Sequence, residues 1–311
     1  MTWDLSVSNR QIQMAEIKRI AVLGADGYIG QNLVKYLQDN YSIQADGYGL
    51  SHNMSDSNLH YVDVTKKETV SIIDLDVDII FMLAGLSGTL AGFDSYEKYV
   101  AVNEIGLLNL LDAIKESPYR PRVVFPSSRL VYKGVDKVLA EGDEKETKTI
   151  YAVNKLACEE YLKVYHNSFN IPFTIFRICV PYGNNLSTEY SYGTVGAFLK
   201  KASSGSDITL YGDGSQKRTF THIDDLCYQL VEGSMKPESV GGTYNIGGEV
   251  LSIREAAQII ADKFGVNVVS VPWPERDLCI ESGHTYFDDT KIRQLLGDIS
   301  YKHFGDFAEN I

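Results

Sequence analysis

The sequence predicts an α/β fold in which a doubly wound parallel sheet (the Rossmann arrangement) is followed by a smaller, mixed α/β substrate region toward the C-terminus. Short apolar segments alternate with amphipathic helical segments from residue 19 to about 180, and a glycine-rich turn joins the first such pair. Beyond 180 the alternation loosens into loops rich in Gly, Asn and Ser. The prediction is therefore an N-terminal extension (1–18), a dinucleotide-binding domain (19–180, with segments returning near 220–248) and a mostly substrate-binding region (181–311).

The elements of the sheet domain follow from their hydrophobic periods. Residues 77–83 are apolar at nearly every position, which is typical of a central parallel strand covered on both faces. Helical periods follow the glycine turn and recur later in the chain. The expected strands are 20–23, 42–48, 59–62, 77–83, 122–125 and 173–178, and the expected helices are 31–39, 96–117, 151–167, 194–202, 223–233 and 253–264.

The composition excludes several partners. The net charge is −12 and the pI is about 5.0, which argues against nucleic acid or an anionic membrane as a partner. The four cysteines are scattered without metal-ligand spacing, so we expect no metal site, reduced thiols and a cytoplasmic setting. No apolar run approaches ~18 residues, and no signal peptide is expected at the N-terminus.

The glycine turn predicts a dinucleotide site. Gly24, Gly27 and Gly30 lie between a strand and a helix, where glycine allows close backbone approach and the helix N-terminus offers free N–H groups to a pyrophosphate. The spacing differs by one residue from the common G-x-G-x-x-G pattern. A glycine turn without a ligand is the plain alternative.

The choice of dinucleotide is less clear from the sequence. An acid at the end of the second strand selects NAD by binding the ribose hydroxyls. Asp46 is close but falls within the expected strand, and residues 50–52 carry neither an acid nor an arginine. We therefore expect NAD, with NADP left open. Asp63, after the third strand, is placed to meet an adenine amino group or is a plain strand-end carboxylate.

Ser128, Tyr151 and Lys155 are the candidate catalytic residues. Tyr151 and Lys155 are four residues apart, so on a helix they share one face. A free phenol titrates near ~10, and a neighbouring cation lowers that pKa. Such a Tyr can exchange a proton with an alcohol or ketone oxygen, which Ser128 could also hold. Tyr-x-x-x-Lys alone is also common on solvated helix faces.

Taken together, these pieces resemble the extended short-chain dehydrogenase/reductase family, in its branch of NAD(P)-dependent nucleotide-sugar epimerases, dehydratases and reductases. The similarity runs from about 19 to 298. The matching segments are 24–30, 63–64, 83–85, Asn103, 125–132, 151–155, Arg177, 181–183, 211–218 and 244–247.

The resemblance implies roles for these positions. Tyr151 would be the acid/base, Lys155 would bind the nicotinamide ribose and lower the pKa of Tyr151, and Ser128 would hold the sugar hydroxyl. Arg218 and Arg276 would bind the substrate diphosphate, although either could form an ordinary salt bridge. The implied cofactor-binding residues are Gly24, Gly27, Tyr28, Ile29, Gly30, Asp63, Val64, Leu83, Ala84, Gly85, Asn103, Ser127, Tyr151 and Lys155. The implied substrate-binding residues are Ser87, Ser128, Arg129, Tyr192, Arg218 and Arg276.

The departures from the family pattern narrow the activity. Dehydratases of this family have Thr-Asp-Glu where this chain has Ser128, Arg129 and Leu130, and Arg and Leu cannot serve as the acid and base of an elimination, so a 4,6-dehydratase is disfavoured. Val180 stands where many epimerases carry an Asn that contacts substrate. A C4 dehydrogenase, a 4-ketoreductase and a 4-epimerase remain open. The alternatives are a non-catalytic NAD(P)-binding regulator and a reductase of non-nucleotide ketones.

The family also implies a partner. Its members pair two subunits through the helices that correspond here to 96–116 and 151–167, which implies a homodimer. Both helices carry apolar residues that fit either a dimer interface or packing on the sheet, namely Leu107, Leu110, Leu111, Leu156 and Leu162.

Overall fold

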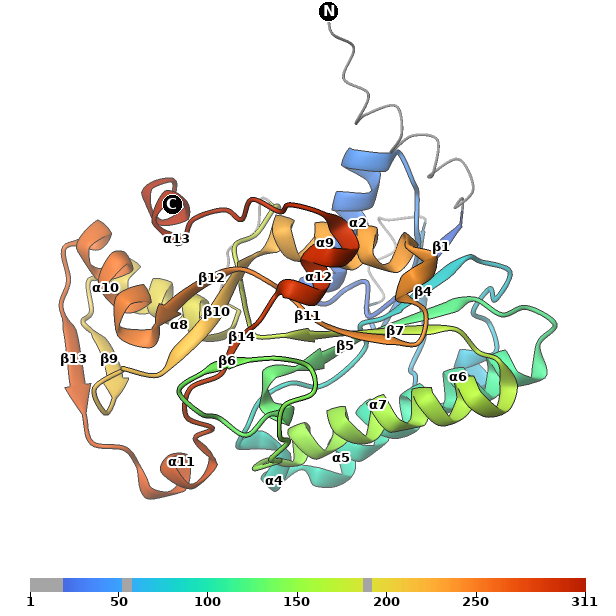
Figure 1. Ribbon diagram of the computed structural model, residues 1–311, viewed down its shortest axis with the longest axis horizontal. Coiled ribbons are helices and arrows are strands. Elements are labelled where there is room, and N and C mark those ends of the chain that lie inside the picture. Colours follow the sequence, from blue (N-terminus) through green and yellow to red (C-terminus); the bar gives the residue numbers. More distant parts are fainter. Residues whose placement is uncertain (1–18, 52–57, 187–191) are drawn as a thin grey trace, which may run out of the picture.

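A computed structural model describes residues 19–51, 58–186 and 192–311 (Figure 1). Its centre is a seven-stranded sheet with the order β11-β7-β5-β4-β1-β2-β3, in which every pair is parallel. The predicted doubly wound sheet is confirmed. Its strands are β1 (Ile20–Leu23), β2 (Asp46–Gly49), β3 (Leu59–Tyr61), β4 (Ile79–Met82), β5 (Arg122–Ser128), β7 (Phe173–Ile178) and β11 (Gly242–Asn245).

Helices cover both faces of this sheet because its central strands are apolar on both sides. Helices α2 (Tyr28–Tyr41), α9 (Ile223–Met235) and α12 (Thr290–Leu296) pack on one face. Helices α6 (Gly106–Glu116) and α7 (Ile150–Phe169) pack on the other, along the lower side of Figure 1. All four residues of β1 and of β4 are buried, as expected for a sheet enclosed between two helical layers.

Two predicted elements differ from the structure. The expected strand 42–48 begins only at Asp46, because Ser42 has a φ of 55° and ends α2 in the left-handed region. The expected helix 96–117 is divided into α5 (Tyr96–Val100), a π-helical turn η1 (Ala101–Ile105) and α6. The π-helical turn contains Asn103, and such turns are frequent at functional sites.

A smaller region lies on the other side of the molecule (Figure 1). A three-stranded sheet joins β8 (Val180–Tyr182), β10 (Lys217–His222) and β12 (Glu249–Ser252), and β9 (Ile208–Tyr211) pairs with β13 (Val268–Val271). Helices α8 (Gly193–Ser203) and α10 (Ile253–Phe264) pack against them around a separate apolar core. The shorter elements are α3 (Lys67–Val70), α4 (Ala91–Asp94), η2 (Arg129–Val131), β6 (Val138–Leu139), η3 (Pro237–Ser239), α11 (Glu275–Ile280), β14 (Tyr286–Phe287) and α13 (Phe304–Glu309). The exact division into domains stays a prediction.

Among the described residues, no helix is both long and apolar enough to cross a membrane.

A buried ion pair ties the sheet to α7. The Arg177 guanidinium on β7 donates to both carboxylate oxygens of Glu159, at 2.9 and 2.6 Å, and the Ser127 hydroxyl donates to the same carboxylate at 2.5 Å. The two charged side chains are 4% and 0% exposed. Burial favours the neutral form of Arg177, but the bidentate bond to Glu159 outweighs it, and the pKa of the guanidinium is raised.

Glu159→Ala should therefore destabilise the protein by about 3–5 kcal/mol, because it leaves a buried guanidinium without its carboxylate. Urea unfolding followed by circular dichroism measures the loss. Glu160→Ala is the matched control: Glu160 is the next residue of α7, lies at the surface and pairs only with Lys163, so less than about 1 kcal/mol is expected. Equal losses in the two variants would contradict a structural role for the buried pair.

Candidate active site

The glycine turn between β1 and α2 has the shape of an anion-binding turn. Gly24 has a φ of +81°, and a Cβ at this position would lie 2.6 Å from the backbone nitrogen of Ala84. A Cβ on Gly30 would lie 2.0 Å from the carbonyl oxygen of Gly24. Helix α2 begins at Tyr28, directly after Gly27, which makes no side-chain cap hydrogen bond. These features fit the pyrophosphate of a dinucleotide.

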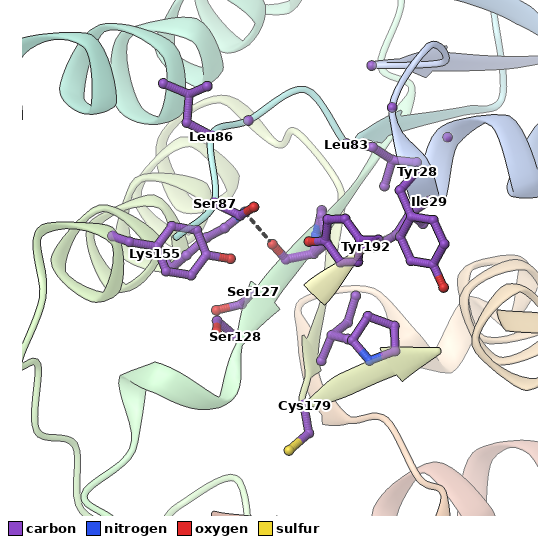
Figure 2. Close-up of a pocket in the computed structure, with 18 residues that line it drawn as sticks. Tyr28, Ile29, Leu83, Leu86, Ser87, Ser127, Ser128, Lys155, Cys179 and Tyr192 are labelled. Atoms are coloured by element: carbon purple, nitrogen blue, oxygen red, sulfur yellow. Dashed lines mark hydrogen bonds between the residues drawn. The ribbon is translucent and has the colours of Figure 1, made fainter. Parts of the chain in front are cut away.

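A pocket of about 310 Å³ opens beside this turn, within the size range of small-molecule sites (Figure 2). It gathers residues from the carboxyl ends of β1, β4, β5 and β7 together with the first turn of α7. Thirteen predicted site residues line it: Gly24, Gly27, Tyr28, Ile29, Gly30, Leu83, Gly85, Ser87, Ser127, Ser128, Tyr151, Lys155 and Tyr192. Five lining residues were missed from the sequence: Leu86, Pro126, Ile178, Cys179 and Pro181. They are apolar or weakly polar neighbours of predicted strand ends, and only that adjacency could have indicated them.

The structure places Ser128 and Tyr151 together in the lining of the pocket, where the Ser128 hydroxyl is near enough to lower the pKa of the Tyr151 phenol. Ser128 ends β5, and its hydroxyl accepts the N–H of Leu130 at 3.2 Å, which starts η2 at a fixed place. Tyr151 lies in the first turn of α7, where the Thr149 hydroxyl caps the helix by accepting the N–H of Ala152 at 3.1 Å. Two local caps therefore set the relative position of the two side chains.

The electrostatics of Tyr151 differ from the sequence prediction. Burial raises the pKa of its phenol, and the main influences that lower it are the neighbouring Ser128 hydroxyl and the charge of Arg129. Lys155 was expected to have that effect. Its ammonium instead donates to the carbonyl of Pro126 at 2.6 Å and lies 5.8 Å from the centre of the Tyr151 ring. The backbone carbonyl at the end of β5 competes for the lysine.

Lys155 is itself perturbed. It is buried beneath the pocket, and its ammonium lies 4.4 Å above the ring of Phe125. Burial lowers its pKa to about 8, although the nearby Cys158 and Glu159 act in the opposite direction. In the protein without bound NAD, Lys155 therefore loses its proton at a pH slightly above neutral.

Two stacked tyrosines line the opposite side of the pocket. The rings of Tyr28 and Tyr192 lie 4.3 Å apart with an interplanar angle of 16°, and the Tyr28 hydroxyl donates to the carbonyl of Gly183 at 2.7 Å. In Figure 2 they lie across from Ser127, Ser128 and Lys155. The stack links the glycine turn to the start of α8.

Several predicted cofactor residues lie behind the pocket or away from it. The Asn103 amide accepts the N–H of Leu86 at 2.7 Å and donates to its carbonyl at 3.1 Å, so it holds the 85–87 loop that lines the pocket. The Asp63 carboxylate accepts the N–H and the hydroxyl of Thr65 at 3.1 and 2.7 Å. Asp63, Val64, Ala84 and Asn103 do not line the pocket, and their predicted cofactor contacts stay predictions.

The three predicted substrate arginines, Arg129, Arg218 and Arg276, do not line the pocket. Arg218 is 3% exposed and bonds Glu281 at 2.7 Å, and burial lowers its pKa to about 10. Arg218 could bind a substrate phosphate only if the phosphate replaced Glu281 as its partner. Arg276 is exposed and pairs with Asp94 at 2.8 Å.

Arg129 has a different environment. Its guanidinium donates to the hydroxyls of Ser282 and Thr285 at 2.8 and 3.0 Å, and it has no carboxylate partner among the described residues. Its charge acts on both Tyr151 and Arg218. Arg129 therefore contributes positive charge next to the reactive centre of an acidic protein.

A family model describes the chain from residue 20 to 247, that of the NAD-dependent epimerase/dehydratase family. The chain belongs to this family, and the predicted resemblance is confirmed. Its cofactor is accordingly NAD, and the glycine turn described above has the geometry to hold it.

Individual relatives agree with this assignment. An uncharacterised UDP-glucose epimerase of Bacillus subtilis is 28% identical over 299 residues, covering 89% of this chain and 92% of that protein. Two solved structures have the same fold at lower identity. The UDP-glucuronic acid 4-epimerase of Bacillus cereus, in complex with UDP-glucuronic acid and NAD, matches with a TM-score of 0.79 at 23% identity, over 94% of this chain and 96% of that one. The dTDP-glucose 4,6-dehydratase of Streptomyces venezuelae matches with a TM-score of 0.80 at 24% identity, over 94% and 95%.

Binding of NAD should weaken as the pH rises through about 8, where free Lys155 loses its proton. A bound dinucleotide anion favours the charged lysine and raises its pKa, so the affinity is constant well below this pH and falls between the free and bound pKa values. Isothermal titration calorimetry across this range measures the dependence. The Lys155→Met variant should bind NAD more weakly, and its affinity should not change with pH in this range. An unchanged pH dependence in this variant would exclude Lys155 as its source.

Proposed function

We propose that this chain is an NAD-dependent enzyme that oxidises or reduces C4 of a nucleotide-diphosphate sugar. The observation that carries the proposal is that Ser128, Tyr151 and Lys155 line one pocket together with the glycine turn. NAD, when bound, supplies the acceptor or donor of the hydride. The other requirements of the reaction fall on side chains of this protein.

Tyr151 is the proton carrier in this proposal. Its phenol oxygen takes the proton of the C4 hydroxyl during oxidation and returns it during reduction. Ser128 holds the same sugar oxygen by a hydrogen bond, and Arg129 stabilises the phenolate by its charge. Lys155, whose ammonium is held by the Pro126 carbonyl, binds the nicotinamide ribose.

Elimination of water is disfavoured by the residues that follow Ser128. A 4,6-elimination needs an acid for the leaving hydroxyl and a base for the C5 proton, but positions 129 and 130 are Arg and Leu. An arginine side chain donates hydrogen bonds but has no acceptor, and a leucine side chain has no polar group, so neither supplies that acid and base. A 4-epimerase, a 4-dehydrogenase and a 4-ketoreductase are consistent with this set, and the relatives include epimerases.

The substrate would bind toward the second region, where the charge of Arg129 acts on Arg218 and Arg218 pairs with Glu281. Guanidinium groups bind phosphate oxygens in pairs, which suits a nucleotide diphosphate. A regulator without activity would need no proton carrier such as Tyr151, and a reductase of small ketones would need neither arginine. A nucleotide sugar is therefore our proposal for the substrate class.

We also propose a homodimer, although the leucines first considered do not support it. Leu107, Leu110, Leu111 and Leu162 are buried against the sheet, and Leu156 packs on the neighbouring apolar cluster. The outer faces of the same helices carry other exposed apolar residues, namely Val100, Ile105, Val153 and Val164. Pairing through these faces would remove them from water. The cytoplasmic setting, suggested by four free cysteines, is likewise a proposal.

Val164→Glu should therefore shift the protein toward monomer, because it places a charge within the proposed helix interface. Size-exclusion chromatography with light scattering measures the mass. Val250→Glu, at a similarly exposed valine of β12, should leave the mass of the wild type unchanged. A wild-type monomer, or a dimer that survives Val164→Glu unaltered, would contradict this interface.

Tyr151→Phe should lower turnover by about 100-fold or more, as expected when the positioned proton carrier is removed. Binding of NAD should change little, since the phenyl ring still fills the site. The assay offers a panel of UDP-, dTDP- and GDP-sugars, followed by the absorbance of reduced nicotinamide and by product NMR. Isomer exchange without net reduction marks an epimerase, whereas net reduction marks a dehydrogenase. Tyr165→Phe, on the same helix, is the control, and activity that survives Tyr151→Phe would disprove the mechanism.

A further inference from the structure

The end of β2 lacks the residue that usually decides between NAD and NADP. In doubly wound folds an acid at this place binds the ribose 2′-hydroxyl. Here Leu50 and Ser51 follow the strand, and the nearest acid in the sequence, Asp46, is its first residue and lies at the opposite end. The strand itself therefore offers no carboxylate to the ribose.

The glycine turn supplies a carboxylate to the same place. One oxygen of Asp26, Oδ2, accepts the backbone N–H groups of both Leu50 and Ser51 at 2.9 Å each. The carbonyl of Asp26 also accepts the side-chain amide of Gln31 at 2.8 Å, which ties this part of the turn to α2. Asp26 thus reaches from the β1–α2 turn across to the end of β2 and is held there by three hydrogen bonds.

The last residue of β2 leaves room for this carboxylate. A Cβ on Gly49 would lie 2.3 Å from Oδ1 of Asp26, closer than any side chain could approach. Oδ1 receives no hydrogen bond from the described residues, so it keeps its acceptor capacity. The carboxylate is held through one oxygen and leaves the other available to a ligand.

We propose that Asp26 selects NAD over NADP by occupying the adenosine-ribose position that the acid of β2 usually fills. Ribose hydroxyl groups would donate to Oδ1, which favours NAD. A 2′-phosphate would meet a like charge, and it would find the two N–H groups at the strand end already bonded to Oδ2. Lys35, which lines the same groove as Asp26 and Ser51, pairs with Asp39 at 2.7 Å and is not left free to compensate.

This inference goes beyond the proposed function, because it concerns the cofactor site and does not depend on the sugar. The test measures the dissociation constants of NAD and NADP by isothermal titration calorimetry without any sugar substrate. The wild type should prefer NAD. Asp26→Asn should reduce the NAD/NADP preference by about ten- to a hundredfold, as for a hydrogen bond to a charged group. The asparagine oxygen can still accept from Leu50 and Ser51, so the turn should keep its shape.

Asp46→Asn, at the other end of β2, is the matched control and should keep the wild-type preference. Asp26→Ser is the second variant, and it should also reduce the preference for NAD over NADP, because it removes the charge. The thermal unfolding temperature of each variant shows whether it is folded. A folded Asp26 variant with the wild-type preference, or a wild type that binds NADP as tightly as NAD, would overturn the proposal. Failure of the sugar assay alone would leave these binding results unaffected and would bear only on the proposed function.

Discussion

The bond between Glu159 and Arg177 is the constraint on which the geometry of the site depends. It joins three elements: α7 through Glu159, β7 through Arg177, and β5 through the Ser127 hydroxyl on the same carboxylate. Glu159 lies one helical turn beyond Lys155, and Ser127 immediately precedes Ser128. The ion pair therefore fixes the helix that carries the proton carrier against the strand that carries its partner.

The network extends from this pair to β11, the edge strand of the main sheet. A further N–H of Arg177 donates to the Tyr132 hydroxyl at 2.7 Å, and that hydroxyl donates to Asn245 at 2.7 Å. Asn245 ends β11, the strand through which the chain returns to the main sheet. A buried polar network of this kind is costly unless every member is bonded, and here the described members satisfy one another. It connects the catalytic elements to the edge of the sheet nearest the smaller region.

The sequence predicts those features that depend on local chemistry. The glycine turn, the strand–helix alternation and the Ser128, Tyr151 and Lys155 set all rest on residues whose type and spacing carry the signal. Lining residues such as Ile178 and Cys179 carry no chemical pattern of their own, and they enter the pocket only because β7 lies beside β5 in the sheet. The predicted start of the strand 42–48 was wrong because Ser42 adopts a positive φ. The sequence does not indicate this, since a serine rarely has that conformation.

Long-range pairing accounts for the other differences. Arg218 carried the signature of a phosphate ligand, but its partner Glu281 is 63 positions away and no local pattern reveals the pairing. Asp26 is the converse case: it lies inside the glycine turn, where sequence rules assign no role, and only the approach of β2 shows where its carboxylate lies. Lys155 was placed on the correct helix face, yet the Pro126 carbonyl, 29 positions away, takes its ammonium.

The central claim is that these residues act on the C–H bond at C4 of the sugar, and a kinetic isotope effect tests it most directly. Single-turnover rates are measured with the nucleotide sugar that the enzyme accepts, carrying deuterium at C4, or at C3 or C5 for comparison. The structure and the proposed role of Tyr151 predict a slower reaction with deuterium at C4 alone. Equal rates with and without deuterium at C4, accompanied by loss of label from C3 or C5 to solvent, would contradict the account.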